Sequence, residues 1–556
     1  MLTRGIRLGT VVLTLALLGC SSSTTGPDAG PGAHDGLYDV VAKTGGIGDA
    51  PLSNGGAIGP GTGGRAGSGG VSGGSAGNTS VSDASSEAGP VGTGGTTAKL
   101  DASTSVDGAV ADGADMRALD AGKAIDVLTT IDALDANVPY DLGVDRPASV
   151  EAPPCLHAFN DPSCWSSQDL SVLHPNGALF GGIYDGKHVY FPSSIVGSSD
   201  GWWNGNKTGV GQMLSYDPQQ DFASDNAWTV FATTDVSPAA FAFAGAVFDG
   251  RYVYFPPFNP SGESVALRYD TTASFTQATA WASSDLQTFN KSYSPVGYVG
   301  GAFDGRYVYF VPNCFYEYPN GLILRYDSQG TFADAASWSV FDTQTLSQDA
   351  AGFVGVAFDG RYLYFPSFGD LSNNWRDYTA IMIARYDTQA SFTDTKSWTT
   401  LDATKMSNTA GFGGAVFDGR YVYFLPADYQ PGDTILRYDS KGDFAAAGSW
   451  TGFGVTSVTG RYTRFMGGLF DGRYLYLVPT RTGDVAVRYD TTADFGTAAA
   501  WAAFDLKGWD ARAEGFAGGV FDGRFVYFVP GFGKEIVRFE AYATPVKQTK
   551  LPASFL

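Results

Sequence analysis

The chain has 556 residues, including 74 glycines, and carries a formal net charge of −21 at pH 7. Such an acidic chain should repel nucleic acid and anionic lipid head groups, so we expect no nucleic-acid partner. Its length would suit about three or four domains, but internal repeats indicate one large body instead.

The first residues have the pattern of an export signal. Two arginines precede an apolar stretch at residues 8–18, which is too short to span a bilayer, and a Leu-Leu-Gly run then leads to Cys20. This ending resembles the lipobox of bacterial lipoproteins. The resemblance implies that residues 1–19 are removed as a signal peptide, that Cys20 is lipidated, and, because Ser21 follows, that the anchor lies in the bacterial outer membrane. An ordinary signal peptide with a chance cysteine is the alternative.

Residues 20–150 are rich in Gly, Ser, Ala, Thr and Asp and contain few aromatic side chains. This composition cannot bury enough apolar surface to offset the entropy of the chain. We therefore predict a long disordered tether, with a root-mean-square reach of about 60 Å, that holds a globular head away from the membrane.

The rest of the chain is built from seven copies of one motif, Phe-Asp-Gly-Arg-Tyr-Val-Tyr-Phe or a close variant. Successive copies are 51–64 residues apart, which is typical of a repeat architecture. The Asp-Gly steps begin at Asp185, Asp249, Asp304, Asp359, Asp418, Asp471 and Asp522.

Each repeat divides into four short strands, which the fifth repeat illustrates. The predicted strands are a at 413–417, b at 420–425, c at 435–439, and d beginning at Trp450. Asp-Gly between two apolar runs is a strong signal for a hairpin turn between strands a and b. The apolar residues do not alternate with polar ones, which suits sheets covered on both faces, as in stacked blades.

The strands indicate how the ring closes. In six repeats the Tyr-Asp of strand c is followed after 11 residues by the Trp of strand d, but the seventh repeat ends near Glu540 without a strand d. Residues 164–170 resemble a strand d that has no blade of its own. We therefore predict an all-β fold, a seven-bladed β-propeller over residues 151–545 that is closed by its N-terminal strand and followed by a tail at 546–556.

The repeat resembles the kelch motif over about 375 residues of the chain. The shared elements are the Asp-Gly turn, Tyr423 of strand b, the Tyr438-Asp439 pair of strand c, and Trp450. The chain departs from kelch where Val-Pro or Leu-Pro replaces the Gly-Gly that should end strand b. Its connection from strand c to strand d is also longer and contains an extra Phe444.

The charged and tryptophan residues that recur in the motif are interpreted as structural. Because the strands run antiparallel, the arginine that starts strand b should face the acid that ends strand c. The expected pairs include Arg420 with Asp439, Arg251 with Asp270, Arg306 with Asp327, Lys187 with Asp217, and Arg524 with Glu540. The seven tryptophans should fill the space between blades.

Cysteine and histidine usage argues against a built-in metal centre. Cys155 and Cys164 are the natural pair for a disulfide in an oxidising compartment, and the sequence leaves open whether they are bridged. If they are, Cys314 is a free thiol. Four histidines are too few and too scattered for a copper centre such as that of kelch-type galactose oxidase. We expect no cofactor. A calcium site formed by loop carboxylates is an alternative that the residue spacing does not support. The carboxylates are those of Asp200, Asp370, Asp377 and Asp433.

Loop lengths divide the two faces of the expected ring. The a–b turns and c–d segments share one face, the turn face, and are nearly constant. The interval that contains the b–c loop varies from 18 to 32 residues and lies on the opposite face, the loop face. Long loops rich in Trp, Tyr and Asn suit a ligand site, unless they fold back to cap the face. The candidate binding residues are Trp202, Trp203, Asn204, Tyr316, Tyr318, Asn374, Trp375, Arg376 and Tyr378.

Three hypotheses about function follow. The first is an outer-membrane lipoprotein that presents a binding platform for a glycan or an envelope protein. The second is a glycan-processing hydrolase or lyase that uses carboxylates of the long loops. The third is a structural scaffold in an envelope assembly. Strand a carries no charged side chain into the central channel, so we lean against an enzyme and expect no catalytic residue there.

Overall fold

The computed structural model describes the chain over residues 155, 158–174, 178–194, 211–258, 264–288, 297–315, 318–369, 380–406, 411–427, 432–480, 483–531 and 533–542. The predicted signal segment with Cys20, the tether and the tail at 546–556 lie outside this part. None of the helices that the structure describes is long and apolar enough to cross a membrane.

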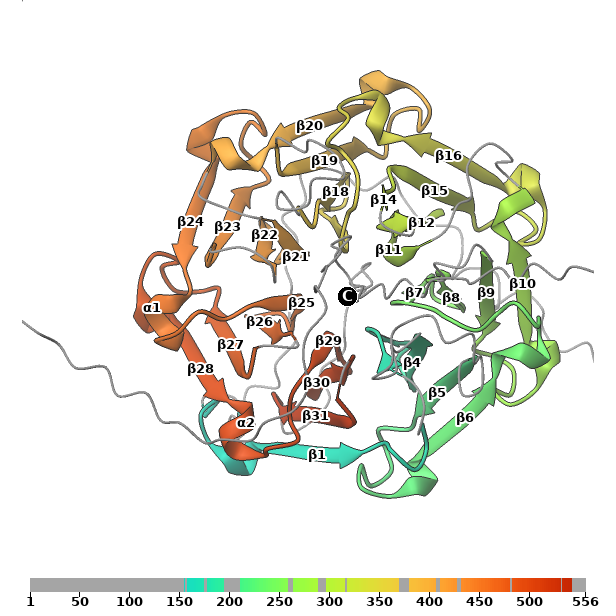
Figure 1. Ribbon diagram of the computed structural model, residues 1–556, viewed down its shortest axis with the longest axis horizontal. Helices are drawn as coiled ribbons and strands as arrows, with labels where there is room; N and C mark the ends of the chain where they lie inside the picture. Colours follow the sequence, from blue (N-terminus) through green and yellow to red (C-terminus); the bar gives the residue numbers. More distant parts are fainter. Residues whose placement is uncertain are drawn as a thin grey trace, which may run out of the picture. The chain divides into compact units, whose positions relative to one another are not determined.

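The described residues form a seven-bladed β-propeller, as predicted. Seven antiparallel sheets are arranged around a central axis, each with its strand a innermost (Figure 1). Six sheets have four strands. The sheet of blade 1 has five, because its innermost strand is divided into β2 and β3, both of which pair with β4.

The bounds of the strands repeat from blade to blade. The innermost strands, a, are β2 (Ala178–Leu179), β3 (Ile183–Tyr184), β7 (Val247–Phe248), β11 (Tyr298–Phe303), β17 (Ala357–Phe358), β21 (Phe412–Phe417), β25 (Phe465–Phe470) and β29 (Phe516–Phe521). Strands b are β4 (Val189–Ser194), β8 (Tyr252–Phe255), β12 (Tyr307–Pro312), β18 (Tyr362–Pro366), β22 (Tyr421–Pro426), β26 (Tyr474–Pro479) and β30 (Phe525–Pro530). Strands c are β5 (Gln212–Tyr216), β9 (Val265–Asp270), β15 (Leu322–Asp327), β19 (Met382–Asp387), β23 (Thr434–Asp439), β27 (Val485–Asp490) and β31 (Glu535–Glu540). The outermost strands, d, are β6 (Trp228–Ala232), β10 (Trp281–Asp285), β16 (Trp338–Asp342), β20 (Trp398–Asp402), β24 (Trp450–Gly454), β28 (Trp501–Asp505) and β1 (Trp165–Asp169).

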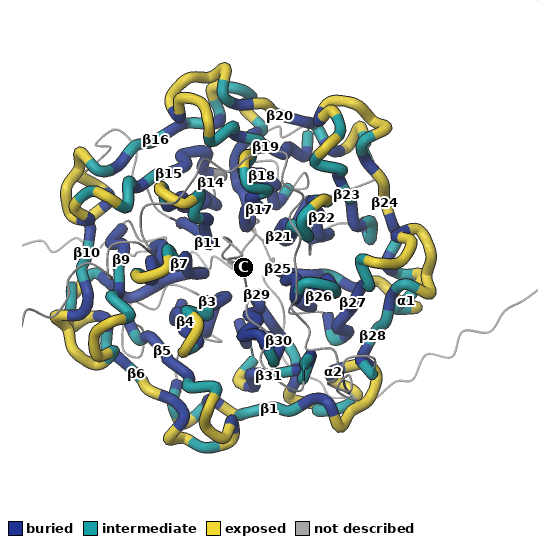
Figure 2. Tube along the Cα trace, turned by 180° about the vertical axis from the view of Figure 1, so that it is seen from behind, coloured by how far each residue is buried: buried dark blue, intermediate teal, exposed yellow. Residues whose placement is uncertain are grey.

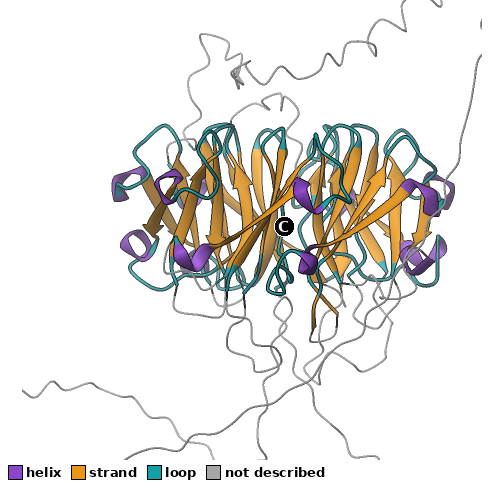
Figure 3. Cartoon of the chain, turned by 90° about the horizontal axis from the view of Figure 1, so that it is seen from above, coloured by secondary structure: helices purple, strands orange, loops and turns teal. Residues whose placement is uncertain are grey.

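Among the described residues, a short helix precedes each outermost strand and another follows every outermost strand except β1, at the outer edge of the propeller (Figure 3). Those before strand d are η1 (Pro162–Cys164), η2 (Asp225–Ala227), η4 (Ala278–Ala280), η6 (Ala335–Ser337), η8 (Thr395–Ser397), η10 (Ala447–Ser449) and η11 (Ala498–Ala500). Those after it are η3 (Thr233–Asp235), η5 (Leu286–Thr288), η7 (Thr343–Thr345), η9 (Ala403–Lys405), α1 (Thr456–Thr459) and α2 (Leu506–Trp509).

The predicted closure of the ring is confirmed. Strand β1 pairs antiparallel with β31, with Trp165 opposite Phe539 and Asp169 opposite Glu535. The N-terminal strand thus supplies the outermost strand of blade 7, whose other three strands come from the far end of the chain. In the fifth repeat, the observed strands agree with the predicted ones to within one residue.

The innermost strands contact one another closely at the axis, which explains the recurrent glycines. At Gly245, where φ is 74°, an added Cβ would lie 2.6 Å from the Cα of Gly300 in the next blade. The backbone amide of Gly300 donates to the carbonyl of Ala244 across the same contact, at 2.8 Å. A side chain here would force the two blades apart.

The aspartate of each Asp-Gly turn ties strand a to strand b. In blade 2, Oδ1 of Asp249 accepts from the amides of Arg251 and Tyr252, and Oδ2 accepts from the hydroxyl of Tyr254 at 2.7 Å. All seven blades repeat this pattern, with hydroxyl distances of 2.6–2.9 Å. The sequence predicted the turn but not that its aspartate also binds a buried tyrosine.

The c–d segment is held by its own tryptophan. In blade 5 the indole Nε1 of Trp450 donates to the carbonyl of Phe444, six residues earlier, at 2.9 Å. Each of the seven tryptophans makes the equivalent bond and is buried, as expected. The extra phenylalanine that departs from kelch is therefore a fixed part of this repeat.

The predicted arginine–acid pairs form on the turn face, with one exception. Arg251–Asp270, Arg306–Asp327, Arg361–Asp387, Arg420–Asp439, Arg473–Asp490 and Arg524–Glu540 all lie within 2.6–2.8 Å. The expected pair of Lys187 with Asp217 is wrong, since the described residues include no ion pair between them. In the other blades the guanidinium also stacks on an aromatic ring at the start of strand b, as Arg251 does on Tyr252, whereas His188 stands there in blade 1.

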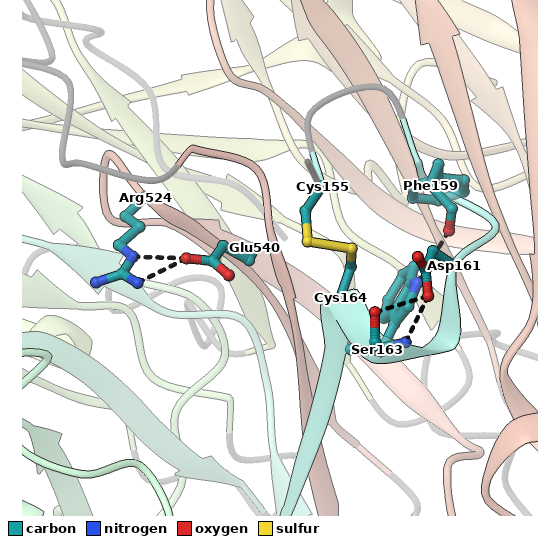
Figure 4. The surroundings of a disulfide bond; sticks show 8 residues. Cys155, Phe159, Asp161, Ser163, Cys164, Arg524 and Glu540 are labelled. Carbon is teal, nitrogen blue, oxygen red and sulfur yellow. Dashed lines mark hydrogen bonds and ion pairs between the residues drawn. A yellow bond between two sulfur atoms is a disulfide. The ribbon is translucent and has the colours of Figure 1, made fainter. Parts of the chain in front are cut away.

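The disulfide left open by the sequence is present. Cys155 and Cys164 are bridged with a Cα–Cα distance of 5.5 Å, directly before the closing strand β1. Asp161 caps η1 between them by accepting from Ser163, and the Arg524–Glu540 pair lies nearby in the same view (Figure 4). The side chain of Cys314 lies outside the described residues.

Candidate functional site

On the turn face, the same contacts recur from blade to blade, and the residues exposed to solvent lie at the outer edge. Exposed positions gather at the c–d segments around the edge of the propeller, whereas the strands between them are buried (Figure 2). The predicted arginine–acid pairs occupy this face in six of the seven blades. This face therefore offers the same structural contacts in nearly every blade.

Nearly all of the predicted binding residues on the loop face lie outside the described residues. These are Trp202, Trp203, Asn204, Tyr316, Asn374, Trp375, Arg376 and Tyr378. Tyr318 is placed only by its backbone, in a small hairpin formed by β13 (Cys314–Phe315) and β14 (Tyr318–Pro319). The insertion predicted in repeat three thus adds a two-stranded sheet to the loop face.

The described part of the loop face contains a polar cluster that the sequence analysis missed. We call Asp169, Asp510, Arg512 and Glu535 the Glu535 cluster. Its members come from the end of β1, from the connection after α2, and from the start of β31, which lie side by side in Figure 1. Glu535 is directly opposite Asp169 in the sheet of blade 7.

Glu535 is the centre of the cluster. Its side chain is 2% exposed, and Oε1 accepts from Nη1 of Arg512 at 2.7 Å. Oε2 has no hydrogen-bond partner among the described residues, and the hydroxyl of Ser167 donates to Asp510 at 3.0 Å. The same guanidinium holds Asp510 through Nη2 at 3.1 Å.

Burial and hydrogen bonding separate the two carboxyl groups held by Arg512. Burial raises the pKa of Glu535 above its ordinary value. Burial acts in the same direction on Asp510, but hydrogen bonds from the backbone and side chain of Arg512 and from Ser167 outweigh it and lower the pKa of that carboxyl. The pKa values of the two carboxyl groups are thereby shifted in opposite directions, as in pairs that divide the roles of acid and base.

The sequence did contain a signal for Glu535. The residue five positions before the terminal acid of strand c is uncharged in the other six blades, at Gln212, Val265, Leu322, Met382, Thr434 and Val485. A carboxylate at a buried strand position is costly unless it has a partner. Its ion-pair partner Arg512 and its like-charged neighbour Asp169 come from other segments of the chain, so the sequence alone did not bring them together.

The structure provides no metal centre in the part of the chain that it describes. Among those residues, no three His, Cys, Asp or Glu side chains are grouped in a way that could hold an ion. Asp433, one of the calcium candidates, instead accepts from the amide of Thr456 at 3.1 Å, at the start of α1. Asp200, Asp370 and Asp377 lie outside the described residues.

Comparisons with known proteins give distant matches to solved structures only. No protein-family model matches the chain, and no curated protein matches it. The structure of a catalytically inactive virginiamycin B lyase from Staphylococcus aureus with quinupristin matches with a TM-score of 0.44 and 13% identity, over 68% of this chain and 99% of that one. A chain of the mitotic checkpoint complex matches with a TM-score of 0.43 and 10% identity, over 71% of this chain and 98% of that one.

A third match is to PorZ, a surface component of the type-IX secretion system of Porphyromonas gingivalis. Its TM-score is 0.39 and its identity 10%, over 70% of this chain and 40% of that one. At these identities and TM-scores, the matches carry no information about activity, ligand or partner. The seven-bladed fold therefore rests on the observed strand order and pairing of this chain.

Proposed function

We propose that the protein is a lipoprotein whose kelch-like propeller binds a glycan or an envelope protein on the loop face. The observation that carries this proposal is the contrast between the two faces. Hydrogen bonds on the turn face recur blade after blade, whereas the b–c connections on the loop face differ in length and one adds the β13–β14 hairpin. Variable loops on a uniform scaffold are the usual place for a binding site.

The aromatic anchors would be Trp202, Trp203, Tyr316, Tyr318, Trp375 and Tyr378, with Asn204, Asn374 and Arg376 as hydrogen-bonding groups. Aromatic rings and amides together suit stacking on sugar rings or anchoring a protein partner. Lipidation of Cys20 would hold the protein in the outer membrane. Replacing Cys20 with Ser should release it from the membrane fraction, and a Cys20→Ser variant that stays there would contradict the anchor.

The ligand proposal is tested by screening the full chain against glycans and isolated envelope proteins, with and without calcium. Trp375→Ala should weaken binding at least tenfold, which corresponds to about 1.4 kcal/mol, without changing the melting temperature. Gln277→Ala, an exposed change on the turn face, is the matched control. Unchanged binding by Trp375→Ala, or a collapse of its thermal transition, would show that Trp375 is no binding residue. Silence across all glycans would favour the protein ligand, and silence in both arms would favour a scaffold.

A second candidate function, a glycan-processing hydrolase, is favoured by the Glu535 cluster. Glycoside hydrolysis uses two carboxyl groups whose pKa values are set apart, and Glu535 and Asp510 differ in this way. Both are held by Arg512, whose side chain is 61% exposed, so a substrate would have to displace it. If the protein releases sugar from a polysaccharide panel, Glu535→Gln and Asp510→Asn should each abolish the release. Asp443→Asn on the turn face should not, and equal loss in that control would reject the assignment.

A further inference from the structure

A second arginine, present in six of the seven repeats, forms a contact between blades that the loop-face proposal does not use. It stands two residues before the terminal acid of strand c in six blades, as Arg268, Arg325, Arg385, Arg437, Arg488 and Arg538. Its guanidinium lies between an aromatic ring at the start of strand b of its own blade and a phenylalanine of the following blade. Arg437 illustrates this, with its Cζ 4.2 Å from the ring centroids of both Tyr421 and Phe495.

Polar contacts fix the same guanidinium at its edges. In blade 7, Nε of Arg538 donates to the hydroxyl of Ser166 on the neighbouring strand at 3.0 Å, and Nη1 donates to the hydroxyl of Tyr216 in the next blade at 3.2 Å. In blade 2, Nη1 of Arg268 donates in the same way to Tyr326 at 3.3 Å. Two rings and two oxygen acceptors thus define a site for a planar cation.

Blade 1 has the surroundings of this site but not the arginine. Ser215 stands in its place, opposite Thr229 on β6. His188 and Phe275 supply the two rings, and the hydroxyl of Tyr269 in blade 2 is the counterpart of Tyr326. We call the position between these residues the vacant arginine position. Among the described residues no Arg or Lys cation lies over Phe275.

The burial of the phenylalanines agrees with a vacant arginine position in blade 1. The six counterparts of Phe275 are Phe159, Phe222, Phe332, Phe392, Phe444 and Phe495, and they are only 1–4% exposed. Phe275 alone is half-buried, since no guanidinium covers its face. An aromatic face left partly open between two blades can accept a cation from solvent without moving the backbone.

The balance of acids and cations in blade 1 also differs from that in the other six blades. In blades 2 to 7 the turn aspartate and the terminal acid of strand c are matched by two arginines; in blade 2 these are Asp249 and Asp270 with Arg251 and Arg268. Blade 1 has two acids, Asp185 and Asp217, but Lys187 is its one cation at these four positions. The vacant arginine position is therefore short of one positive charge relative to every other blade.

We propose that the vacant arginine position binds the arginine side chain of a partner polypeptide. The guanidinium would lie between His188 and Phe275, with Tyr269 and Thr229 as acceptors, as the chain's own arginines lie in the other six blades. Ser215 lies near the turn-face end of β5, so this site is separate from the loop-face site and does not depend on it.

Peptides test the proposal on the full chain. The probe is a blocked Gly-Gly-Arg-Gly-Gly peptide, followed by ligand-observed NMR, with lysine and citrulline versions of the same peptide. We expect binding of the arginine peptide and at least tenfold weaker binding of the other two, because lysine lacks the planar group and citrulline lacks the charge. Equal binding of all three would overturn the proposal.

Variants built from the repeat itself locate the site. Ser215→Arg should fill the position and weaken peptide binding at least tenfold, and adding Arg268→Ser in the same chain should restore binding by opening the equivalent position in blade 2. Gln329→Arg adds the same charge elsewhere on the turn face and should change affinity less than twofold. If Ser215→Arg does not fold, Phe275→Leu replaces it, with the same expected loss.

Three further outcomes contradict the proposal. The first is unchanged peptide binding by Ser215→Arg or Phe275→Leu. The second is a double variant that folds but fails to bind the peptide. The third is a wild-type chain that does not bind the peptide, together with binding by a variant whose arginines outside the described residues are replaced. The last result would show that the chain itself occupies the position.

Discussion

At the scale of single residues, the turn aspartates are buried to different degrees while making the same hydrogen bonds. Asp471 is 4% exposed and Asp522 is 5% exposed. Burial raises the pKa of both, against the hydrogen bonds that they accept, and it raises the pKa of Asp471 to about 6 from 3.8. Where a turn aspartate is buried, its ionisation therefore makes the stability of the core depend on pH.

This gives a prediction about acid stability. Folded Asp471 binds a proton below about pH 6, and the unfolded chain does so only near pH 3.8. The favourable contribution of the protonated group is complete below pH 3.8 and is lost as the pH rises through 6, a change of about 3 kcal/mol. Asp471→Asn removes this titration. The free energy of unfolding of the variant minus that of the wild type should therefore rise by about 2–3 kcal/mol between pH 4 and pH 7.

Denaturant titrations of both proteins across that pH range measure the difference. The variant also changes the hydrogen bond from the Tyr476 hydroxyl. This change adds the same amount to the difference in unfolding free energy at every pH, so the pH dependence of the difference is unaffected. A difference that stays flat from pH 4 to pH 7 would show that Asp471 titrates normally.

At the scale of elements, the c–d segment is a rigid unit and not a loose loop. The tryptophan that ends it packs on the tyrosine of strand c, as Trp450 does on Tyr438 at 4.7 Å between ring centroids, and it also holds the carbonyl of Phe444. The phenylalanine of the same segment then covers the arginine of the preceding blade. One segment thereby stabilises its own blade and the contact with its neighbour.

Replacing Trp450 with Phe should therefore cost more than a surface change in the same segment. The substitution leaves a buried carbonyl without its donor and a space beside Tyr438, at a combined cost of about 2–4 kcal/mol. Lys441→Ala, exposed in the same segment, should change stability by less than about 0.5 kcal/mol. Chemical unfolding of the two variants measures both, and equal effects would indicate that the indole bond contributes nothing.

At the scale of the whole propeller, stability depends on joining the two ends of the folded region. Strand β1 covers β31 and places Trp165 against Phe504, at 4.6 Å between stacked rings, and against Phe528. The disulfide immediately before β1 restricts the approach of this strand. Without β1, blade 7 would expose a strand edge and several aromatic rings.

We expect the Cys155→Ser, Cys164→Ser double variant to remain a closed ring with lower stability. The sequence separation of 9 residues gives a loss of about 2–3 kcal/mol, and reduction of the wild type should have the same effect. Deleting residues 155–169 should instead abolish the single cooperative transition and cause association. Thermal unfolding and gel filtration distinguish the two results. A monomeric deletion variant with the wild-type melting temperature would contradict the role of closure.

The sequence by itself determined the propeller, its blade number and its closure. These features depend on local signals that repeat: the Asp-Gly turn, the apolar strand patterns, the fixed spacing from Tyr-Asp to Trp, and the unpaired strand at 164–170. The arginine–acid pairs of the turn face were also predictable, because antiparallel register within one blade dictates them. The pair expected at Lys187 was wrong because register alone does not hold a flexible lysine against its acid, whereas the planar guanidinium of the other blades also stacks on the neighbouring ring.

Only the tertiary structure decided the contacts between blades. The position of Arg437 between Tyr421 and Phe495, the vacant arginine position beside Ser215, and the meeting of Glu535 with Arg512 all join residues from different blades or from different ends of the chain. The repeat pattern defines each blade separately, and it contains no information on how far neighbouring blades approach or which side chains meet there. Those contacts are set by packing around the closed ring, which exists only once all seven blades are in place.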